Sequence, residues 1–195
     1  MLLPLLTALA LASQSGPFAP PEAAVVVRGG RFWGSGVVWD APAGRVLTAL
    51  HVVEEVADGG IEVVVPGRPP LLARIVDREP SLDLALLEVA GALEAGPPVG
   101  SAAALVVGDP IAYSGCPEAR CGTTDAHVLA TARAFAGSRY LAFFAAVRPG
   151  ASGGPVLDRR GALVGIVDLA LRREPNVALA VPIERAAARF PRPAY

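Results

Sequence analysis

The chain has 195 residues, of which 53% are hydrophobic and 18% charged, and its formal net charge is −1. This composition excludes intrinsic disorder, because the chain has enough apolar residues to bury a substantial core. Charged residues form no block, so the sequence predicts neither a nucleic-acid partner nor an anionic membrane partner.

The first twelve residues, MLLPLLTALALA, are apolar, too short to span a bilayer, and end in small residues at A-x-A spacing. We interpret residues 1–12 as a signal peptide and residues 13–22 as a Pro-rich linker. No Arg or Lys precedes Arg28, so the usual positive n-region is missing, and a buried N-terminal segment is the alternative. No later apolar run predicts a transmembrane span. We therefore expect export to the periplasm, the cell envelope or the extracellular space.

Short valine-rich segments bounded by Gly and Pro follow, which is typical of strands in a β-barrel or sandwich rather than of βαβ units. The first six are predicted at 24–28, 36–39, 45–49, 61–65, 71–77 and 84–89. After a connector at 90–100, six more are predicted at 110–114, 126–134, 140–147, 155–157, 163–169 and 177–181. Only 182–190 has a helical pattern, with Ile183, Ala186, Ala187 and Phe190 on one face. The count predicts an all-β fold of two similar halves.

The chain contains two cysteines, Cys116 and Cys121, in the segment SGCPEARCG. Two thiols cannot form a structural zinc site, and their spacing differs from the redox C-x-x-C pattern. In an exported protein two cysteines this close favour a disulfide, which we predict here.

The segment PGASGGP (149–155) places Ser152 between glycines. Glycines permit a tight turn that exposes the hydroxyl group and lets backbone amides converge on one point. A nucleophile for acyl transfer needs both features, although a Gly/Ser run by itself is also typical of an ordinary turn.

A serine nucleophile needs a base, and the chain has two histidines. His51 follows the strand-like RVLTA and would lie at a strand end, whereas His127 lies inside an apolar run and is typical of a structural histidine. Asp83 stands where the strand at 84–89 begins, where a carboxylate can orient a histidine. Capping of a turn is the alternative role for such an aspartate.

The order of these residues separates the candidate folds. The segment 150–154 also fits the G-x-S-x-G elbow of α/β-hydrolases, but those enzymes place the histidine after the serine and no histidine follows Ser152. The subtilisin order would need Asp40 as the acid and a fold with βα alternation. The order His51, Asp83, Ser152 on an all-β chain leaves the chymotrypsin arrangement.

Six segments resemble the trypsin-like serine proteases, most closely their HtrA/Deg branch, and occur in the family's order. They are GSGVVWD (34–40), LTALHVV (47–53), LDLALLEV (82–89), RPGASGGPVLD (148–158), GALVGIVD (161–168) and ALAVPIERAA (178–187). The resemblance implies an all-β, chymotrypsin-like fold of two six-stranded antiparallel β-barrels with a short C-terminal helix. The N-terminal barrel would occupy residues 23–98, and the C-terminal barrel with the helix residues 99–195.

The same resemblance implies a secreted serine endopeptidase that cleaves polypeptides through an acyl-enzyme, with His51, Asp83 and Ser152 as its triad and without metal or cofactor. The backbone amides of Gly150 and Ser152 would form the oxyanion hole. The substrate pocket would be lined by Ala146, Val147, Leu169, Ala170 and Ala178. The alternative is a catalytically silent protein that keeps the fold as a binding module.

The chain departs from the family pattern at several points. No PDZ domain is expected after Tyr195, and the residue before the nucleophile is Ala151 instead of Asn or Asp. Asp168 stands where the trypsin-like pattern has a serine or another small polar residue. If Asp168 approaches Asp83, one of the two carboxyl groups should hold a proton and donate it to the other. A one-residue register offset, or a carboxylate that points into solvent, is the alternative.

Overall fold

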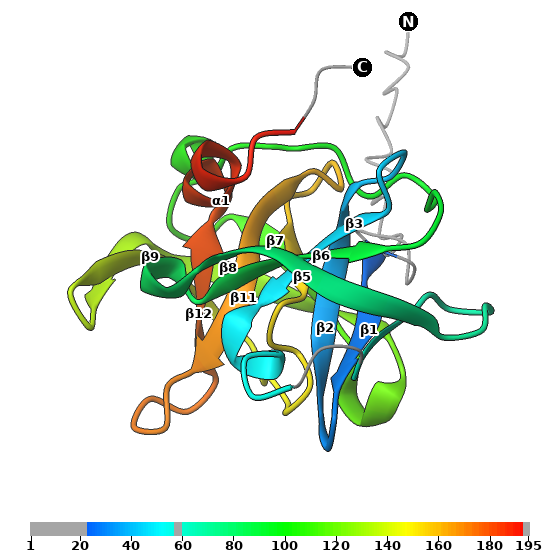
Figure 1. Ribbon diagram of the computed structural model, residues 1–195. Coiled ribbons are helices and arrows are strands. Elements are labelled where there is room, and N and C mark those ends of the chain that lie inside the picture. Colours follow the sequence, from blue (N-terminus) through cyan, green and yellow to red (C-terminus); the bar gives the residue numbers. More distant parts are fainter. Residues whose placement is uncertain (1–22, 57–59, 193–195) are drawn as a thin grey trace, which may run out of the picture.

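The computed structural model describes residues 23–56 and 60–192 (Figure 1). The predicted signal peptide and linker at residues 1–22 therefore lie outside the described residues. Within the described ranges, no helix is both long and apolar enough to cross a membrane.

Twelve antiparallel strands of the described residues close into two six-stranded barrels. The first barrel contains β1 (Val25–Gly29), β2 (Phe32–Asp40), β3 (Arg45–Ala49), β4 (Ile61–Val64), β5 (Leu71–Glu79) and β6 (Leu84–Val89). The second contains β7 (Pro110–Gly115), β8 (Gly122–Phe135), β9 (Ser138–Phe144), β10 (Pro155–Leu157), β11 (Leu163–Ala170) and β12 (Val177–Pro182). The strand order is β1-β2-β3-β6-β5-β4 in the first and, equivalently, β7-β8-β9-β12-β11-β10 in the second. The prediction of an all-β fold with two similar halves is therefore confirmed.

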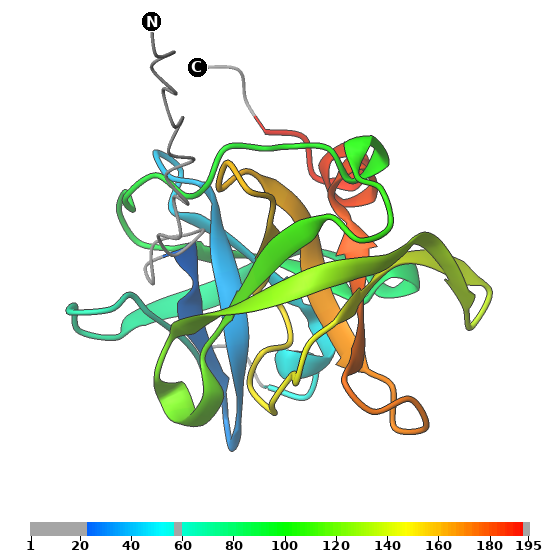
Figure 2. The same ribbon diagram turned by 180° about the vertical axis from the view of Figure 1, so that it is seen from behind.

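Helical segments connect the strands and close the chain. The 3₁₀ turns are η2 (Leu50–Val52), η3 (Pro80–Leu82), η4 (Ala102–Ala104) and η5 (Pro117–Ala119), and the α-helix is α1 (Ile183–Arg189). Helix α1 buries Ile183 and Ala186, and Phe190 directly after it is also buried, on the face predicted from the sequence, while Ala187 is partly buried. Figure 2 shows the segment after β6 crossing one end of the molecule to reach α1, where Glu184 accepts a hydrogen bond from the hydroxyl group of Ser101 at 2.8 Å.

Several strand boundaries differ from the prediction, and the largest differences are in β2, which begins at Phe32 instead of 36, in β8 and in β9. Strand β9 ends at Phe144, so residues 145–147, predicted as strand, leave the sheet and lead to the turn that carries Ser152. Strand β8 begins at Gly122 instead of 126, because Gly122 pairs with Gly115 of β7. Next to this pair, the hydroxyl groups of Ser114 and Thr123 share a hydrogen bond of 2.9 Å. Pairing with β7 therefore extends β8 into residues 122–125, which the local sequence pattern did not predict as strand.

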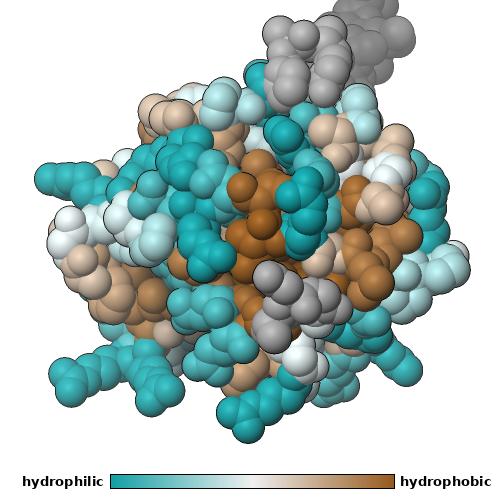
Figure 3. All heavy atoms as spheres, viewed as in Figure 1, coloured by the Kyte–Doolittle hydropathy of each residue, from teal (hydrophilic) through white to brown (hydrophobic). Residues whose placement is uncertain are grey.

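A shared hydrophobic cluster joins the two barrels. Trp39 and Leu47 of the first barrel and Ile166 and Leu179 of the second are among its buried members. Burial of each such large apolar side chain stabilises the fold by about 1.5–3 kcal/mol. The interface therefore holds the two barrels in a fixed orientation relative to each other. The fold still exposes apolar groups, and Figure 3 shows an apolar area framed by hydrophilic residues on the face seen in Figure 1.

Candidate active site

His51 and Asp83 come from neighbouring strands of the first barrel. Strand β3 ends at Ala49, and η2 after it carries the exposed His51, while Asp83 lies between η3 and β6, the strand next to β3. Asp83 adopts a left-handed conformation with φ of 52°, in which its carbonyl accepts the Leu50 amide at 2.8 Å. One carboxylate oxygen of Asp83 accepts the His51 backbone amide at 3.0 Å, and the other is hydrogen-bonded to His51 Nδ1. The aspartate therefore fixes both the backbone and the ring of the histidine.

The environment of His51 favours its protonated form. The hydrogen bond to Asp83 is the largest influence and raises the pKa of His51, while partial burial opposes it. The negative charges of Asp83, Asp168 and Glu54 raise the pKa further. Because Nδ1 is occupied by Asp83, Nε2 is the ring nitrogen left for proton transfer.

The turn that carries Ser152 follows from its glycines and proline. The amide of Ala151 donates to the carbonyl of Arg148 at 3.1 Å, with Pro149 and Gly150 at the two central positions. Gly150 has φ of +95°, so this is the proline–glycine pattern of a type II turn. Gly153 has φ of +84°, and a Cβ atom there would lie 2.2 Å from the carbonyl oxygen of Ser35. Glycine is therefore needed at both positions for steric reasons.

Ser152 is partly buried between the barrels. Its carbonyl accepts the Ser35 amide from the first barrel at 2.8 Å, and the next residue, Gly153, donates to Val167 of the second at 2.7 Å. The Ser152 hydroxyl donates to the backbone carbonyl of Asp168 at 3.2 Å, and no hydrogen bond joins it to His51 in the described structure. The amides of Gly150 and Ser152 donate to no other residue in the described ranges.

Ser35 is a residue that the sequence reasoning missed. It is completely buried in β2, and its hydroxyl group donates to the Gly150 carbonyl at 2.6 Å and accepts the Cys116 amide at 2.8 Å. Thr48 donates in turn to the Ser35 carbonyl at 2.6 Å. Ser35 thereby fastens the nucleophile turn to the first barrel. The sequence does hold a signal for Ser35, because this serine stands between two glycines, directly before the apolar residues of GSGVVWD.

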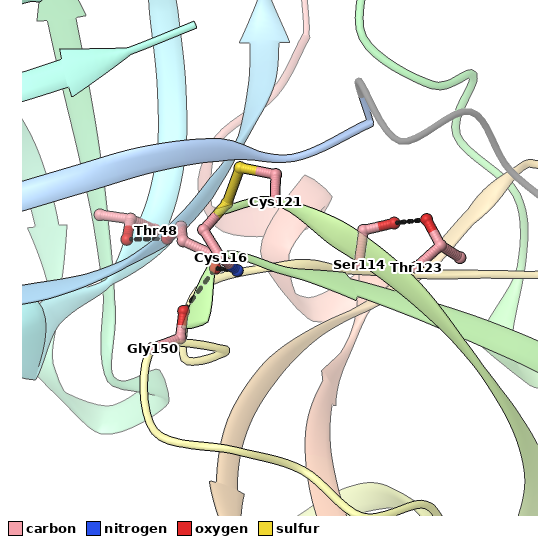
Figure 4. The surroundings of a disulfide bond; sticks show 7 residues. Thr48, Ser114, Cys116, Cys121, Thr123 and Gly150 are labelled. Atoms are coloured by element: carbon pink, nitrogen blue, oxygen red, sulfur yellow. Dashed lines mark hydrogen bonds between the residues drawn. A yellow bond between two sulfur atoms is a disulfide. The ribbon is translucent and has the colours of Figure 1, made fainter. Parts of the chain in front are cut away.

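Cys116 and Cys121 are joined by a disulfide, as predicted (Figure 4). The bond closes the loop around η5, in which Glu118 and Ala119 have positive φ values of 52° and 61°. Such conformations are unfavourable for residues other than glycine, so the loop needs a constraint that holds it in this shape. The disulfide provides that constraint. Figure 4 shows Gly150 near Cys116.

Replacing both cysteines by serine should lower the free energy of unfolding by about 2 kcal/mol or less, since the closed loop is short. We expect a larger effect on the order of residues 116–121 than on global stability. Chemical denaturation of both proteins measures the first effect and amide hydrogen exchange the second. Intact-mass measurement of secreted protein before and after reduction checks the bond itself, and two free thiols in unreduced material would contradict it.

The five predicted pocket residues lie in different environments. Ala146 is exposed and contributes to an open cavity of about 370 Å³ together with Arg148 and Ala151. Val147 and Leu169 are partly buried, and Ala170 is exposed. Ala178 pairs with Ala170 across β11 and β12 but is completely buried. In this structure Ala178 therefore offers no surface to a ligand.

Asp168 lies beside the His51–Asp83 pair and is only 6% exposed, so the alternative of a solvent-directed carboxylate is wrong. One side-chain donor atom from each of the three residues lies within 4.8 Å of the other two. Burial, followed by the charge of Asp83 and a hydrogen bond to it, raises the pKa of Asp168 to about 6. In the described part of the chain this is the one cluster of three side chains able to ligate a metal, but hydrogen bonds already engage its atoms.

Residues 34–166 match the model of the trypsin-like peptidase domain. The chain is 32% identical over 158 residues to the "Probable periplasmic serine endoprotease DegP-like" of Pseudomonas putida, covering 77% of this chain and 32% of that protein.

Similar solved structures include the following two. The HtrA-type protease AlgW, determined with a tripeptide, has a TM-score of 0.78 at 26% identity, covering 87% of this chain and 59% of that one. An inactive form of Rv3671c from M. tuberculosis has a TM-score of 0.73 at 24% identity, covering 90% of each chain. This chain spans between 24% and 32% of the length of the first curated relatives that it matches.

Proposed function

Because the chain belongs to the family of trypsin-like peptidase domains, we propose that it is a serine endopeptidase with Ser152 as nucleophile, His51 as general base and Asp83 as the orienting acid. The observation that carries this proposal is the pair of hydrogen bonds that Asp83 accepts from His51, beside Asp168, whose backbone carbonyl accepts the hydroxyl group of Ser152. We also place the boundary of its two barrel domains, 23–98 and 99–195, at Pro98, whose carbonyl accepts the Leu163 amide of the second barrel.

The mechanism uses each of these groups in turn. The Ser152 hydroxyl leaves its bond to the Asp168 carbonyl, transfers its proton to Nε2 of His51 and attacks the scissile carbonyl carbon. The amides of Gly150 and Ser152 stabilise the oxyanion, and Asp83 stabilises the imidazolium. His51 then protonates the leaving amine. In the second half of the reaction, His51 accepts a proton from the attacking water and returns it to Ser152 as the acyl-enzyme is hydrolysed.

A serine-directed fluorophosphonate tests this proposal directly. We expect the probe to add to Ser152, as located by peptide mass spectrometry, and a peptide substrate to protect the protein from labelling. A folded protein that takes up no probe would instead be a catalytically silent binding module. Prior denaturation provides the control, because labelling of an activated serine requires the folded site.

Export is part of the same proposal. The disulfide between Cys116 and Cys121 is stable in an oxidising compartment, and the similar Pseudomonas putida protein is named as periplasmic. Residues 1–12 would direct the export.

The substrate residue before the cut bond should be small or aliphatic, such as Ala, Val or Leu. The proposed pocket has no acid near Ala146 to bind an Arg or Lys side chain. One methylene in an apolar pocket discriminates by about 10–200-fold, so the preference should be broad. Cleavage of a peptide library, read by mass spectrometry, measures it.

A matched variant sharpens the test of specificity. Ala146→Asp places a carboxylate at the proposed pocket floor and should shift cleavage toward Arg and Lys. Unmodified protein that already cleaves mainly after Arg or Lys would contradict the assignment of the pocket.

A further inference from the structure

The least usual feature of the site is the second carboxyl group beside the His51–Asp83 pair. Asp168 belongs to β11, where the register with β12 passes from Val167 opposite Ala180 to Leu169 opposite Leu179. Asp168 is therefore the extra residue of a bulge, without a partner across the ladder. Bulges redirect side chains and are frequent next to active sites. This one places the Asp168 carboxyl group beside Asp83 and its backbone carbonyl on the hydroxyl group of Ser152.

The groups around Asp168 are mostly acidic or neutral. Asp83 faces it from the start of β6 and His51 from η2, and Tyr140 of β9 interacts with its carboxyl group. Burial, then the charge of Asp168, raises the pKa of Tyr140, so the phenol stays protonated near the carboxyl group. Two more distant charges also act here: Glu54 on His51, and Arg185 of α1 on Tyr140. Only His51 offers Asp168 a nearby positive charge among the groups described.

We propose that Asp168 is a positioning residue that controls the protonation of His51. In mildly acidic solution its carboxyl group donates a proton to Asp83. Above that pH range, the negative charge of Asp168 stabilises the imidazolium form of His51. The neutral imidazole that acts as general base therefore forms only at higher pH. The enzyme would therefore require more alkaline solution than the same triad with an uncharged residue at position 168. This inference rests on the proposed function of Ser152, His51 and Asp83.

The direction of the effect follows from electrostatics. A second anion close to an imidazolium stabilises the charged form, so the pKa of His51 is higher with Asp168 ionised than with asparagine in its place. A neutral imidazole is required to accept the Ser152 proton. Asp168→Asn keeps a hydrogen-bond donor for Asp83 and removes the charge, whereas Asp168→Ala removes both.

The primary experiment is an NMR titration of the histidine rings in the full chain, because it needs no catalytic activity. We expect His51 to titrate at lower pH in Asp168→Asn than in the unmodified protein. His127, exposed in β8 and outside the cluster around Asp168, is the internal control. Glu54→Gln removes a more weakly acting, exposed charge and should cause a smaller shift of His51. An unchanged His51 titration in Asp168→Asn would overturn the proposal.

The pH profile of kcat/KM supplies the second readout. Asp168→Asn should reach its own maximal rate at lower pH and be several-fold more active than the unmodified protein on the acidic side. Asp168→Ala should have a lower maximum, because Asp83 loses its donor. Identical profiles in all three proteins would overturn the proposal. Absence of peptidase activity in the unmodified protein would refute the proposed function, while the histidine titration still decides the role of Asp168.

A measurement on the unmodified protein covers the case in which the variants fail to fold. The carboxyl carbon of Asp168, observed by ¹³C NMR, should titrate at about 6 instead of near its ordinary 3.8. A titration near the ordinary value would show that Asp168 donates no proton to Asp83 in mildly acidic solution, and would overturn the proposal.

Discussion

Replacing Ser152 by alanine should lower kcat by a factor of about 10⁶ and leave the fold intact. The remaining rate over water would come from the oxyanion-binding amides and from substrate binding. The fold should survive because the backbone bond from Ser35 to Ser152 does not involve the side chain. The lost hydroxyl group makes only one hydrogen bond, to the carbonyl of Asp168.

The measurement is single-turnover hydrolysis of a peptide substrate, with circular dichroism to verify folding. Ser101→Ala is the matched control. It removes a hydroxyl group that donates a hydrogen bond to Glu184 of α1, away from the triad. Ser152→Ala that keeps more than about one per cent of the activity would show that another group is the nucleophile.

Replacing Asp83 by asparagine should lower kcat by a factor of about 10⁴. The carboxylate holds His51 in the tautomer with its proton on Nδ1 and stabilises the imidazolium formed during attack. An amide carries no charge and can also donate to Nδ1, which favours the wrong tautomer. Asparagine suits the position sterically, because it tolerates the left-handed conformation that Asp83 adopts at φ of 52°.

The kinetic profile of Asp83→Asn should show a reduced kcat with KM nearly unchanged, because Asp83 contacts His51 rather than the substrate. Glu62→Gln is the control for a lost carboxylate in the same barrel, since Glu62 forms an ion pair with the partly buried Arg28 of β1. Activity of Asp83→Asn within about tenfold of the unmodified protein would contradict the role of Asp83.

For some strands, the local sequence pattern was sufficient to predict where the strand begins and ends. The segments 45–49, 84–89 and 155–157 were predicted with the boundaries that they have in the structure. Their limits are set by turn residues and apolar periodicity within a few positions. The ends of β8 and β9 were predicted incorrectly, because pairing with another strand or departure toward the nucleophile turn decides them.

The candidate site divides in the same way. His51, Asp83 and Ser152 were found from residue type, chain order and glycine turn chemistry, which are properties of the sequence alone. Ser35 was missed because its partners, Gly150 and Cys116, lie 115 and 81 residues away in the chain. A hydrogen bond over such a separation has no periodic signature.

By itself the sequence determined the fold class, the twelve strands and the residue types available for acyl transfer, because short-range periodicity and turn chemistry encode them. The tertiary structure alone decided three things: the closure of each barrel, the bond of the Ser152 hydroxyl to Asp168, and the burial of the Asp168 carboxyl group beside Asp83. Each depends on how two distant strands align, and a bulge of a single residue in β11 is enough to change which side chain lies beside His51 and Asp83.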